Sequence, residues 1–283
     1  ALAPALVAAS VIFGYRAFVL VAVSAANCVL LETVWNRLMK KPDTYADLSA
    51  VVTGVLIAFN VPVEMPIWQL LVGDFIAIII VKMLFGGLGC NFLNPALVGR
   101  VSMMLSFTSG MTAYHTQVAK VDALSSATPL SVIGDLEMSN LGTLLLGQHG
   151  GMIGETCAIA ILLGGAYLIF RGVIKWTIPV CFAASVLVFT FLFNGFDATA
   201  AVLSVFSGGL MLGAVFMATD YVTSPMTRKG QVIFGIGCGF LTVCIRLFAS
   251  AAEGVSFAIL LMNLVVPYIN EGCRTKPLGG VKA

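Results

Sequence analysis

Charged side chains are scarce in this sequence. Asp, Glu, Lys and Arg together make up 10% of its 283 residues, whereas hydrophobic residues make up 59% and the mean hydropathy is +1.03. Soluble domains contain about 25% charged residues, so the composition excludes an ordinary soluble protein. Together with long apolar runs of helical length, it indicates an all-α integral membrane protein.

The sequence also lacks the short motifs of several functional classes. It has no P-loop, no dinucleotide fingerprint and no nucleic-acid patch, so neither ATP-driven work nor a nucleic-acid partner is expected. The seven cysteines include no C-x-x-C pair, and His115 and His149 lack metal-ligand spacing. We therefore predict no metal site and no disulfide framework. Only Cys90, beside a double-glycine turn, is a candidate ligand among the cysteines.

An initiator methionine is missing as well, and the chain begins inside an apolar run. We expect it to be trimmed, with a cytoplasmic segment in the missing part. About ten apolar runs are candidate membrane spans: residues 1–13, 17–36, 48–62, 67–84, 90–107, 152–170, 176–193, 198–218, 231–250 and 254–270. The runs that contain Asn60-Val-Pro62 and Asn94-Pro95 are expected to be broken or tilted helices.

The distribution of basic residues predicts the orientation. With the N-terminus inside, most Lys and Arg fall on the cytoplasmic side: Arg37, Lys40, Lys41, Arg171, Lys175, Arg228, Lys229, Arg274, Lys276 and Lys282. Only Arg16 and Lys120 remain outside. The positive-inside rule thus places both termini in the cytoplasm and the stretch 108–151 outside it.

An internal repeat divides the chain. Residues 54–60 (GVLIAFN), followed by Pro62, resemble residues 213–219 (GAVFMAT), followed by Pro225. Residues 81–85 (VKMLF) resemble 245–248 (IRLF) at nearly the same offset. Because the two copies run in opposite directions, we predict inverted five-helix repeats at 1–107 and 152–270, an extracytoplasmic loop at 108–151 and a cytoplasmic tail at 271–283. The alternative is chance similarity of apolar sequence.

Three polar side chains interrupt the fifth run. Asn91 and Asn94 are three residues apart and would share one helix face, where amides suit the edge of a flavin or quinone. Arg100 lies deeper, where an arginine costs about 2.5–3.5 kcal/mol to insert, so an anionic or carbonyl partner is expected. The alternatives are interhelical hydrogen bonds for the asparagines and a structural ion pair for Arg100.

Other polar stretches lie at the ends of apolar runs. Thr219 and Asp220 precede a proline-containing turn and form either a Na⁺ or proton site or an ordinary polar turn. The stretch 150–156 is either a phosphate-holding glycine turn or a common helix start. The acids Glu32, Asp74 and Glu253 are expected at the membrane interface.

The longest polar stretch contains Asp122 and Thr128, separated by small residues and followed by Pro129. An uncrowded threonine hydroxyl is a candidate acceptor for covalent modification, and the alternative is an ordinary surface turn.

Four stretches together resemble one known family. Asp122-x-x-Ser125-Ser126-Ala127-Thr128 is similar to the flavinylation motif D-x-x-[ST]-G-A-T, with Ser126 in the glycine position. Residues 91–100, 151–156 and 216–225 match the family that includes the D subunit of the Rnf complex and the B subunit of Na⁺-translocating NADH:quinone reductase. The resemblance covers essentially the whole chain, and its length favours the Rnf branch.

The resemblance implies a function and its residues. Thr128 would carry FMN through a phosphoester bond made by a separate flavin transferase, which reads a motif that includes Asp122, Ser125, Ser126 and Ala127. Glu155 and Thr156 belong to a second motif, and Asn91, Asn94 and Arg100 to a site for a noncovalent flavin, riboflavin or FMN. Ser126 departs from the commoner glycine, which bears on the efficiency of flavinylation.

The implied fold is the ten-helix inverted repeat of urea transporters. The implied activity is that of a subunit of an ion-translocating oxidoreductase, which passes electrons between ferredoxin and NAD beside other flavin and iron–sulfur subunits. We expect a cation path near Asp220, Thr219 and Arg100. The alternatives are a B-type quinone-reductase subunit or a channel of the urea-transporter kind without redox activity.

Overall fold

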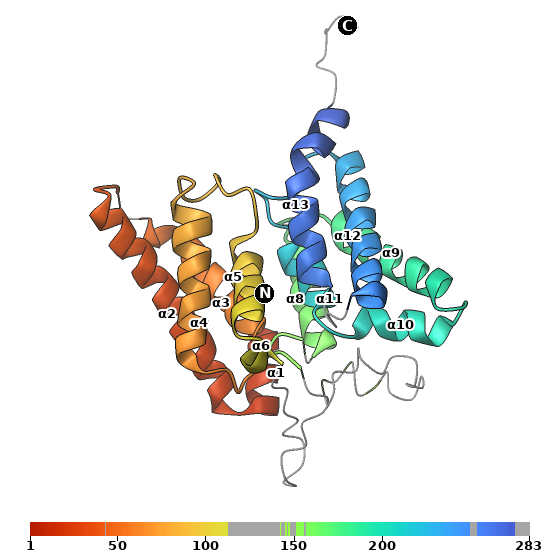
Figure 1. Ribbon diagram of the computed structural model, residues 1–283, viewed down its shortest axis with the longest axis horizontal. Helices are drawn as coiled ribbons and strands as arrows, with labels where there is room; N and C mark the ends of the chain where they lie inside the picture. The colour runs from red at the N-terminus through yellow and green to blue at the C-terminus, as the bar shows by residue number, and fades with distance from the viewer. Residues whose placement is uncertain are drawn as a thin grey trace, which may run out of the picture.

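The computed structural model describes residues 1–42, 44–112, 142, 145, 147, 151–155, 157–249 and 254–274. Within these residues every regular element is a helix and no strand occurs. The helices form two groups that lie side by side (Figure 1). The part of the chain that the structure describes is therefore all-helical, as the composition predicts.

The first group contains the elements before residue 112. These are α1 (Ala3–Phe13), α2 (Tyr15–Leu38), the short 3₁₀ helix η1 (Tyr45–Asp47), α3 (Ser49–Phe59), α4 (Ile67–Phe75), the π-helical η2 (Ile76–Met83), α5 (Pro95–Ser106) and α6 (Thr108–Met111). Helix α4 continues directly into η2, so the predicted span 67–84 is one helical run.

The second group begins at residue 158. It consists of α8 (Ala158–Phe170), α9 (Thr177–Phe193), α10 (Ala198–Phe206), α11 (Leu210–Leu212), the π-helical η5 (Gly213–Met217), α12 (Arg228–Phe248) and α13 (Val255–Gly272). Helices α2, α12 and α13 are long and apolar enough to cross a membrane. Helix α10 and the stretch Leu210–Met217 form a fourth candidate span, which is bent by 63°. Four shorter apolar helices are α1, α3, α8 and α9.

Packing follows the same order in the two groups. In the first, α2 packs against α3 and α4; in the second, α9 packs against α10 and α12. Glycine allows one of these close approaches, because a Cβ on Gly54 of α3 would lie only 2.7 Å from the Ser24 carbonyl oxygen of α2. The groups meet where α1 contacts α8 and where α5 contacts α13.

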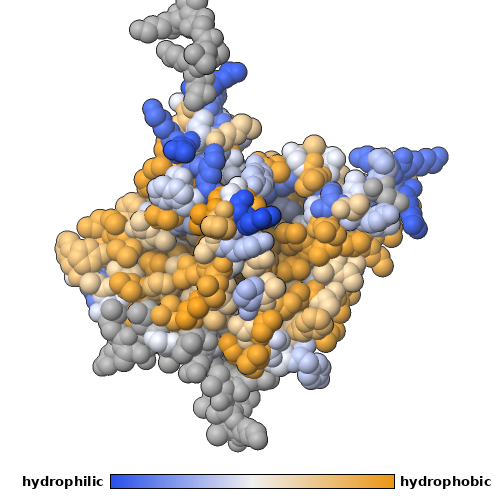
Figure 2. All heavy atoms as spheres, turned by 180° about the vertical axis from the view of Figure 1, so that it is seen from behind, coloured by the Kyte–Doolittle hydropathy of each residue, from blue (hydrophilic) through white to orange (hydrophobic). Residues whose placement is uncertain are grey.

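The outer surface of the helices is apolar. Phe170 is 90% exposed and Val11 79% exposed, although both are large hydrophobic residues. Figure 2 shows apolar residues across the middle of one face, with polar and charged residues gathered toward its upper end. A continuous apolar band of this kind is the surface that lipid covers.

Candidate functional site

The flavinylation motif is not part of the described structure. Asp122, Ser125, Ser126, Ala127 and Thr128 lie outside the described residues, as do Thr156 and Glu253. Covalent FMN on Thr128 therefore stays a prediction. The geometry that follows concerns the sites that the described helices build.

A buried polar cluster lies between the two helix groups. We call Asn60, Arg100, Met152 and Glu155 the central cluster. The Arg100 guanidinium donates to Asn60 Oδ1 at 2.8 Å and to Met152 Sδ at 3.0 Å, and it lies 3.4 Å from Glu155 Oε1. Arg100 is 2% exposed and Glu155 5%. The prediction that Arg100 has an anionic or carbonyl partner is confirmed, since it has both.

Breaks in two helices position the central cluster. Helix α3 ends at Asn60, whose Nδ2 donates back to the Leu56 carbonyl at 2.6 Å and contacts Met217 Sδ at 3.7 Å. The bend between α10 and α11 brings Gly209 so close that a Cβ there would lie 2.7 Å from Glu155 Oε1. Broken helices at membrane depth require such protein contacts, because lipid cannot satisfy the freed backbone groups.

Arg246 of α12 also contacts the bend between α10 and α11. Its guanidinium donates to the carbonyl oxygens of Ser204 at 2.7 Å and Ser207 at 3.1 Å, which are free where α10 ends. A cation at a helix C-terminus also complements the helix dipole. Arg246 acts electrostatically on Glu155 as well, so two guanidinium groups share one buried carboxylate.

The expected common helix face of Asn91 and Asn94 is wrong. Helix α5 starts only at Pro95, because Asn94 caps it by accepting from the amides of Ala96 at 3.0 Å and Leu97 at 3.4 Å. The Asn94 Nδ2 donates to the Met217 carbonyl at 3.1 Å. Its amide is thus used for capping and for joining the two groups, and it does not offer a free edge to a flavin.

Asn91 precedes the helix in an irregular segment. Its side chain is 7% exposed and donates to the Leu93 carbonyl at 3.1 Å. The preceding turn has positive φ at Gly86, Gly87 and Gly89, which explains the glycines there. Nothing lies within 4 Å of a Cβ placed on Gly87 or Gly89, so the space above this turn is open. Cys90 is exposed beside it.

The stretch 151–155 matches the ordinary helix start better than a phosphate cradle, and Gly150 and Thr156 lie outside the described residues. The amides of Ile153, Gly154 and Glu155 already donate to the carbonyls of Val61, Phe59 and Met152 at 2.8–3.1 Å. Helix α8 begins only at Ala158. The Glu155 side chain points into the central cluster instead, so the segment connects the end of α3 with the buried ion pair.

Asp220 and Thr219 form a polar turn after η5. The Asp220 carboxylate accepts from the Thr223 hydroxyl at 2.9 Å, and the Thr219 hydroxyl donates to the Val215 carbonyl at 2.6 Å. Burial raises the pKa of Asp220, although hydrogen bonds from Thr223 and neighbouring amides oppose the rise. The arrangement matches the polar-turn alternative, with a carboxyl group that retains a proton more readily than usual.

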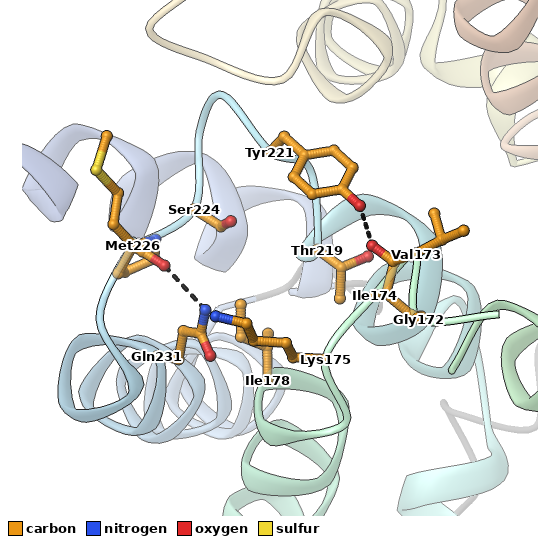
Figure 3. Close-up of a pocket in the computed structure, with 11 residues that line it drawn as sticks. Gly172, Val173, Ile174, Lys175, Ile178, Thr219, Tyr221, Ser224, Met226 and Gln231 are labelled. Carbon is orange, nitrogen blue, oxygen red and sulfur yellow. Dashed lines mark hydrogen bonds between the residues drawn. The ribbon is translucent and has the colours of Figure 1, made fainter. Parts of the chain in front are cut away.

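A cavity of about 320 Å³ lies beside this turn (Figure 3). It is lined by residues of two connecting segments and of helices α9 and α12, among them Lys175, Thr219, Ser224 and Gln231. The Tyr221 hydroxyl closes one side by donating to the Val173 carbonyl, and Gln231 Nε2 donates to the Pro225 carbonyl at 3.1 Å. No motif in the sequence predicts this cavity.

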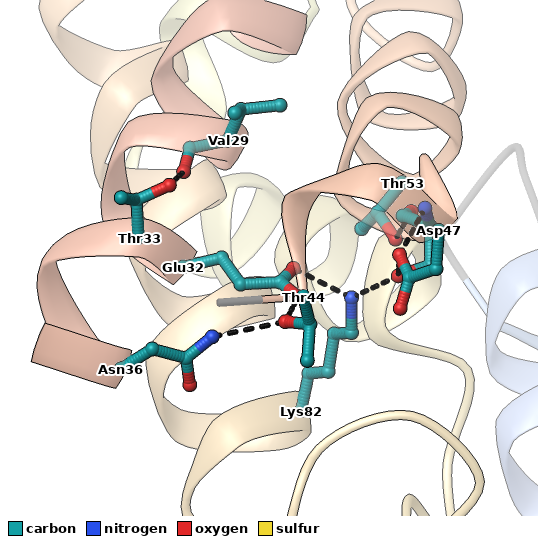
Figure 4. Close-up of polar contacts among 9 residues, drawn as sticks. Val29, Glu32, Thr33, Asn36, Thr44, Asp47, Thr53 and Lys82 are labelled. Carbon is teal, nitrogen blue, oxygen red and sulfur yellow. Dashed lines mark hydrogen bonds and ion pairs between the residues drawn. The ribbon is translucent and has the colours of Figure 1, made fainter. Parts of the chain in front are cut away.

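Glu32 and Asp74, which were expected at the membrane interface, are both buried within the protein. Glu32 is 2% exposed and Asp74 0%. Glu32 forms an ion pair with Lys82 of η2 at 2.7 Å, and Lys82 also donates to Ser49 Oγ at 2.5 Å (Figure 4). Lys82 was the signal in the sequence, because a lysine within an apolar run requires an acidic partner.

The described residues contain no group of three or more His, Cys, Asp and Glu side chains that could hold a metal ion. Their geometry builds a buried interior that contains paired charges. Pairing of this kind lowers the cost of ionisable side chains within a membrane.

Comparison with known proteins relates the whole chain to one group. The family model described as NQR2, RnfD, RnfE matches residues 1–279. The chain is similar to the D subunit of the Na⁺-translocating ferredoxin:NAD⁺ oxidoreductase complex of Acetobacterium woodii. The two are 44% identical over 287 residues, which cover 100% of this chain and 89% of the relative.

Two further relatives have related names. The D subunit of the proton-translocating ferredoxin:NAD⁺ oxidoreductase complex of Clostridium ljungdahlii is 40% identical over 96% of this chain and 86% of its own length. The D subunit of the ion-translocating oxidoreductase complex of Actinobacillus succinogenes is 33% identical over 98% of this chain and 90% of its own length.

Proposed function

Because the chain belongs to the NQR2, RnfD, RnfE family, we propose that it is the flavin-carrying membrane subunit of an ion-translocating oxidoreductase. In this role it couples electron transfer between ferredoxin and NAD⁺ to the movement of Na⁺ or H⁺. The observation that carries the proposal is the full-length match to relatives named as D subunits of such complexes. The names of these relatives differ in the ion, so the choice between Na⁺ and H⁺ stays open.

The proposed cofactor is FMN, held through a phosphoester on the Thr128 hydroxyl. Asp122, Ser125, Ser126 and Ala127 form the motif that a separate flavin transferase would read. The bound flavin supplies the redox chemistry, and the chain supplies its attachment and surroundings. Other subunits of the complex, with flavins and iron–sulfur centres, are the proposed electron partners.

A second, noncovalent flavin is proposed next to Asn91. The open space above Gly87 and Gly89 supports this position, because a flat ring can approach the backbone there. Asn94 is unsuited to a direct contact, since both ends of its amide are occupied. For Glu155 and Arg100 we propose an indirect role, in which their ion pair holds the helix break behind this turn.

The proposed architecture is ten spans in two inverted five-helix repeats, with cytoplasmic termini and the Thr128 loop outside the cytoplasm. The corresponding packing of α2 with α3 and α4, and of α9 with α10 and α12, supports it. So does the contact between Asn60 and Met217, which lie near the ends of the repeated stretches 54–60 and 213–219. Several helices are shorter than about 20 residues and would require tilt or a locally thin bilayer.

The proposed cation path runs past Asp220 and Thr219 toward Arg100. Its support is the turn at the end of a broken helix, a common location for ion sites in transporters. Replacement of Asp220 by Asn should uncouple ion uptake from electron transfer in vesicles. Coupled uptake at the wild-type rate would contradict this path.

Flavin fluorescence of the denatured chain tests the main proposal. The chain is expressed with a flavin transferase and examined on a denaturing gel as wild type, Thr128→Ala and the control Ser131→Ala, which removes a hydroxyl outside the motif. We expect fluorescence in wild type and control and none in Thr128→Ala, because only Thr128 provides the phosphoester oxygen. A dark wild-type band, with the transferase active on another substrate, would contradict the proposal and favour a channel without redox activity.

A further inference from the structure

Asp74 is a fully buried carboxyl group in the middle of a helix. It lies on the continuous run of α4 and η2, seven residues after Ile67 and nine before Met83. At 1.5 Å per residue it is about 10 Å from one end of this run and about 13 Å from the other. Its exposed fraction is 0%. An ionisable side chain at this depth requires neutralisation or a counterion.

No basic side chain among the described residues forms an ion pair with Asp74. The charged groups on the helices packed against α4 are already engaged or exposed: Arg16 pairs with Glu64, Glu32 with Lys82 and Arg100 with Glu155, while Arg37 is exposed at the end of α2. Helix α3 carries no charged residue. The remaining titratable group beside the carboxylate is the buried thiol of Cys28.

The hydrogen-bond donors around Asp74 are the neutral side chains of Ser24, Asn27 and Cys28, and none of them supplies a positive charge. Ser24 Oγ lies 2.7 Å from Asp74 Oδ1 and 2.9 Å from the Gly54 carbonyl oxygen. A hydroxyl has a single proton, and both neighbours are acceptors when the carboxylate is ionised. The one Ser24 proton is shared between two acceptors, so a proton on Asp74, or a cation bound by all three oxygens, would complete the interactions of this oxygen cluster.

The surrounding atoms are those that a hard cation prefers. Asp74, Ser24 and Gly54 offer carboxylate, hydroxyl and backbone carbonyl oxygens from three helices. The Asn27 amide, whose Nδ2 lies 3.1 Å from Asp74 Oδ2, can turn its own oxygen inward. Oxygen ligands of this mixture are typical of sites for hard cations. Gly54 is required for the geometry, since a Cβ there would collide with the backbone of α2.

The second helix group shows that the fold does not need an acid here. Asp74 precedes Lys82 by eight residues, and eight residues before the matching Arg246 stands Cys238. Cys238 is completely buried in α12, and the nearby Ser185 of α9 donates to the carbonyls of Phe182 and Gly235 at 2.8 and 3.2 Å. The same helix contact is thus built with a neutral thiol in the second group.

From these observations we infer that Asp74, Ser24, Gly54 and Asn27 form a membrane-embedded binding site for a monovalent cation, a proton or Na⁺. Without a basic partner, the carboxyl group would be neutralised by a proton on Asp74. Na⁺ would replace it by binding the same oxygens. The site belongs to the first helix group and is separate from the turn at Asp220.

Infrared difference spectroscopy tests the site without depending on electron transfer. The full chain in its complex is placed in lipid, and the spectrum of Asp74→Asn is subtracted from that of the wild type. We expect the carbonyl stretch of one protonated carboxylic acid at low pH in choline chloride. If the site binds Na⁺, this band should disappear when NaCl replaces choline chloride at constant ionic strength. If the site binds only a proton, the band should disappear only when the pH rises.

Two variants separate binding from folding. Asp74→Cys copies the residue of the second group and should assemble normally while lacking the band. Ser24→Ala removes one oxygen ligand and should raise the Na⁺ concentration for half-loss of the band about tenfold, or shift its pH midpoint if only protons bind. Two results would overturn the inference. One is a carboxylic acid band that changes neither with Na⁺ nor with pH between about 5 and 10, and the other is the absence of the band under all conditions, which would mean that Asp74 is always ionised.

Discussion

The buried pair of Arg100 and Glu155 should contribute far more to stability than a surface pair of the same length. Their charged atoms are 3.4 Å apart, and so are those of Arg16 and Glu64. The side chains of the first pair are 2% and 3% exposed, those of the second 46% and 32%. The chain thus provides two ion pairs that differ in burial and not in distance.

The expected magnitudes follow from the surroundings of each pair. At an effective dielectric constant of about 20, charges at this separation attract each other by about 5 kcal/mol. Loss of Glu155 alone leaves a buried guanidinium uncompensated, for which about 3–5 kcal/mol is typical. An exposed pair contributes about 0–1 kcal/mol because water and salt screen it.

A pair of double-mutant cycles measures this difference. The variants are Arg100→Met and Glu155→Gln, singly and together, and Arg16→Met with Glu64→Gln as the matched cycle. Thermal unfolding in detergent is the assay, in which about 2 °C of midpoint shift corresponds to each kcal/mol. We expect Glu155→Gln to lower the midpoint by about 6–10 °C and the buried pair to show a coupling free energy of at least about 2 kcal/mol. A coupling no larger than that of the surface pair would refute the reasoning.

Three further variants test individual contacts. Asn94→Ala should destabilise the protein by about 1 kcal/mol or more through loss of the α5 cap, whereas Asn94→Asp keeps the cap and should cost less in thermal unfolding. Gly209→Ala should reduce assembly seen by size-exclusion chromatography, because its Cβ would lie 2.7 Å from a carboxylate oxygen; Gly272→Ala, which meets nothing within 4 Å, is the control. Slight burial raises the pKa of Asp47, but hydrogen bonds from Ser49 outweigh it and leave the pKa below its usual value. Its stabilising effect should be complete above about pH 4 and decline as the pH falls through the lower folded value, and Asp47→Asn should remove this part of the pH dependence of the unfolding midpoint.

The sequence predicted the features that follow from local chemistry or from the free-energy cost of burying a charge. The apolar runs predict the all-helical fold class. The free-energy cost of an unpaired guanidinium in a membrane predicts a partner for Arg100. The family is confirmed as well, since four motifs in order are more specific than any one. The bend between α10 and α11 was not predicted, although Ser207 and two glycines mark it.

The wrong predictions concern contacts between distant segments. Asn91 and Asn94 were placed on one helix because their spacing allows it, but Pro95 favours the first turn and makes Asn94 the cap. The partners of Glu32 and Asp74 are not predicted either, because no residue near them in the sequence pairs with them. Their partners come from other helices 50 residues away, which the local pattern does not reveal.

The pairing of Arg100 with Glu155 has a consequence for how the protein is made. When α5 leaves the ribosome, the carboxylate that neutralises its arginine is still 55 residues short of synthesis, and the Met217 carbonyl that receives the Asn94 amide is 123 residues away. A lone arginine in a membrane costs about 2.5–3.5 kcal/mol on insertion scales. We therefore expect α5 to insert stably into the membrane only after the second half has been synthesised. The two halves would then fold together, and the first half would not fold alone.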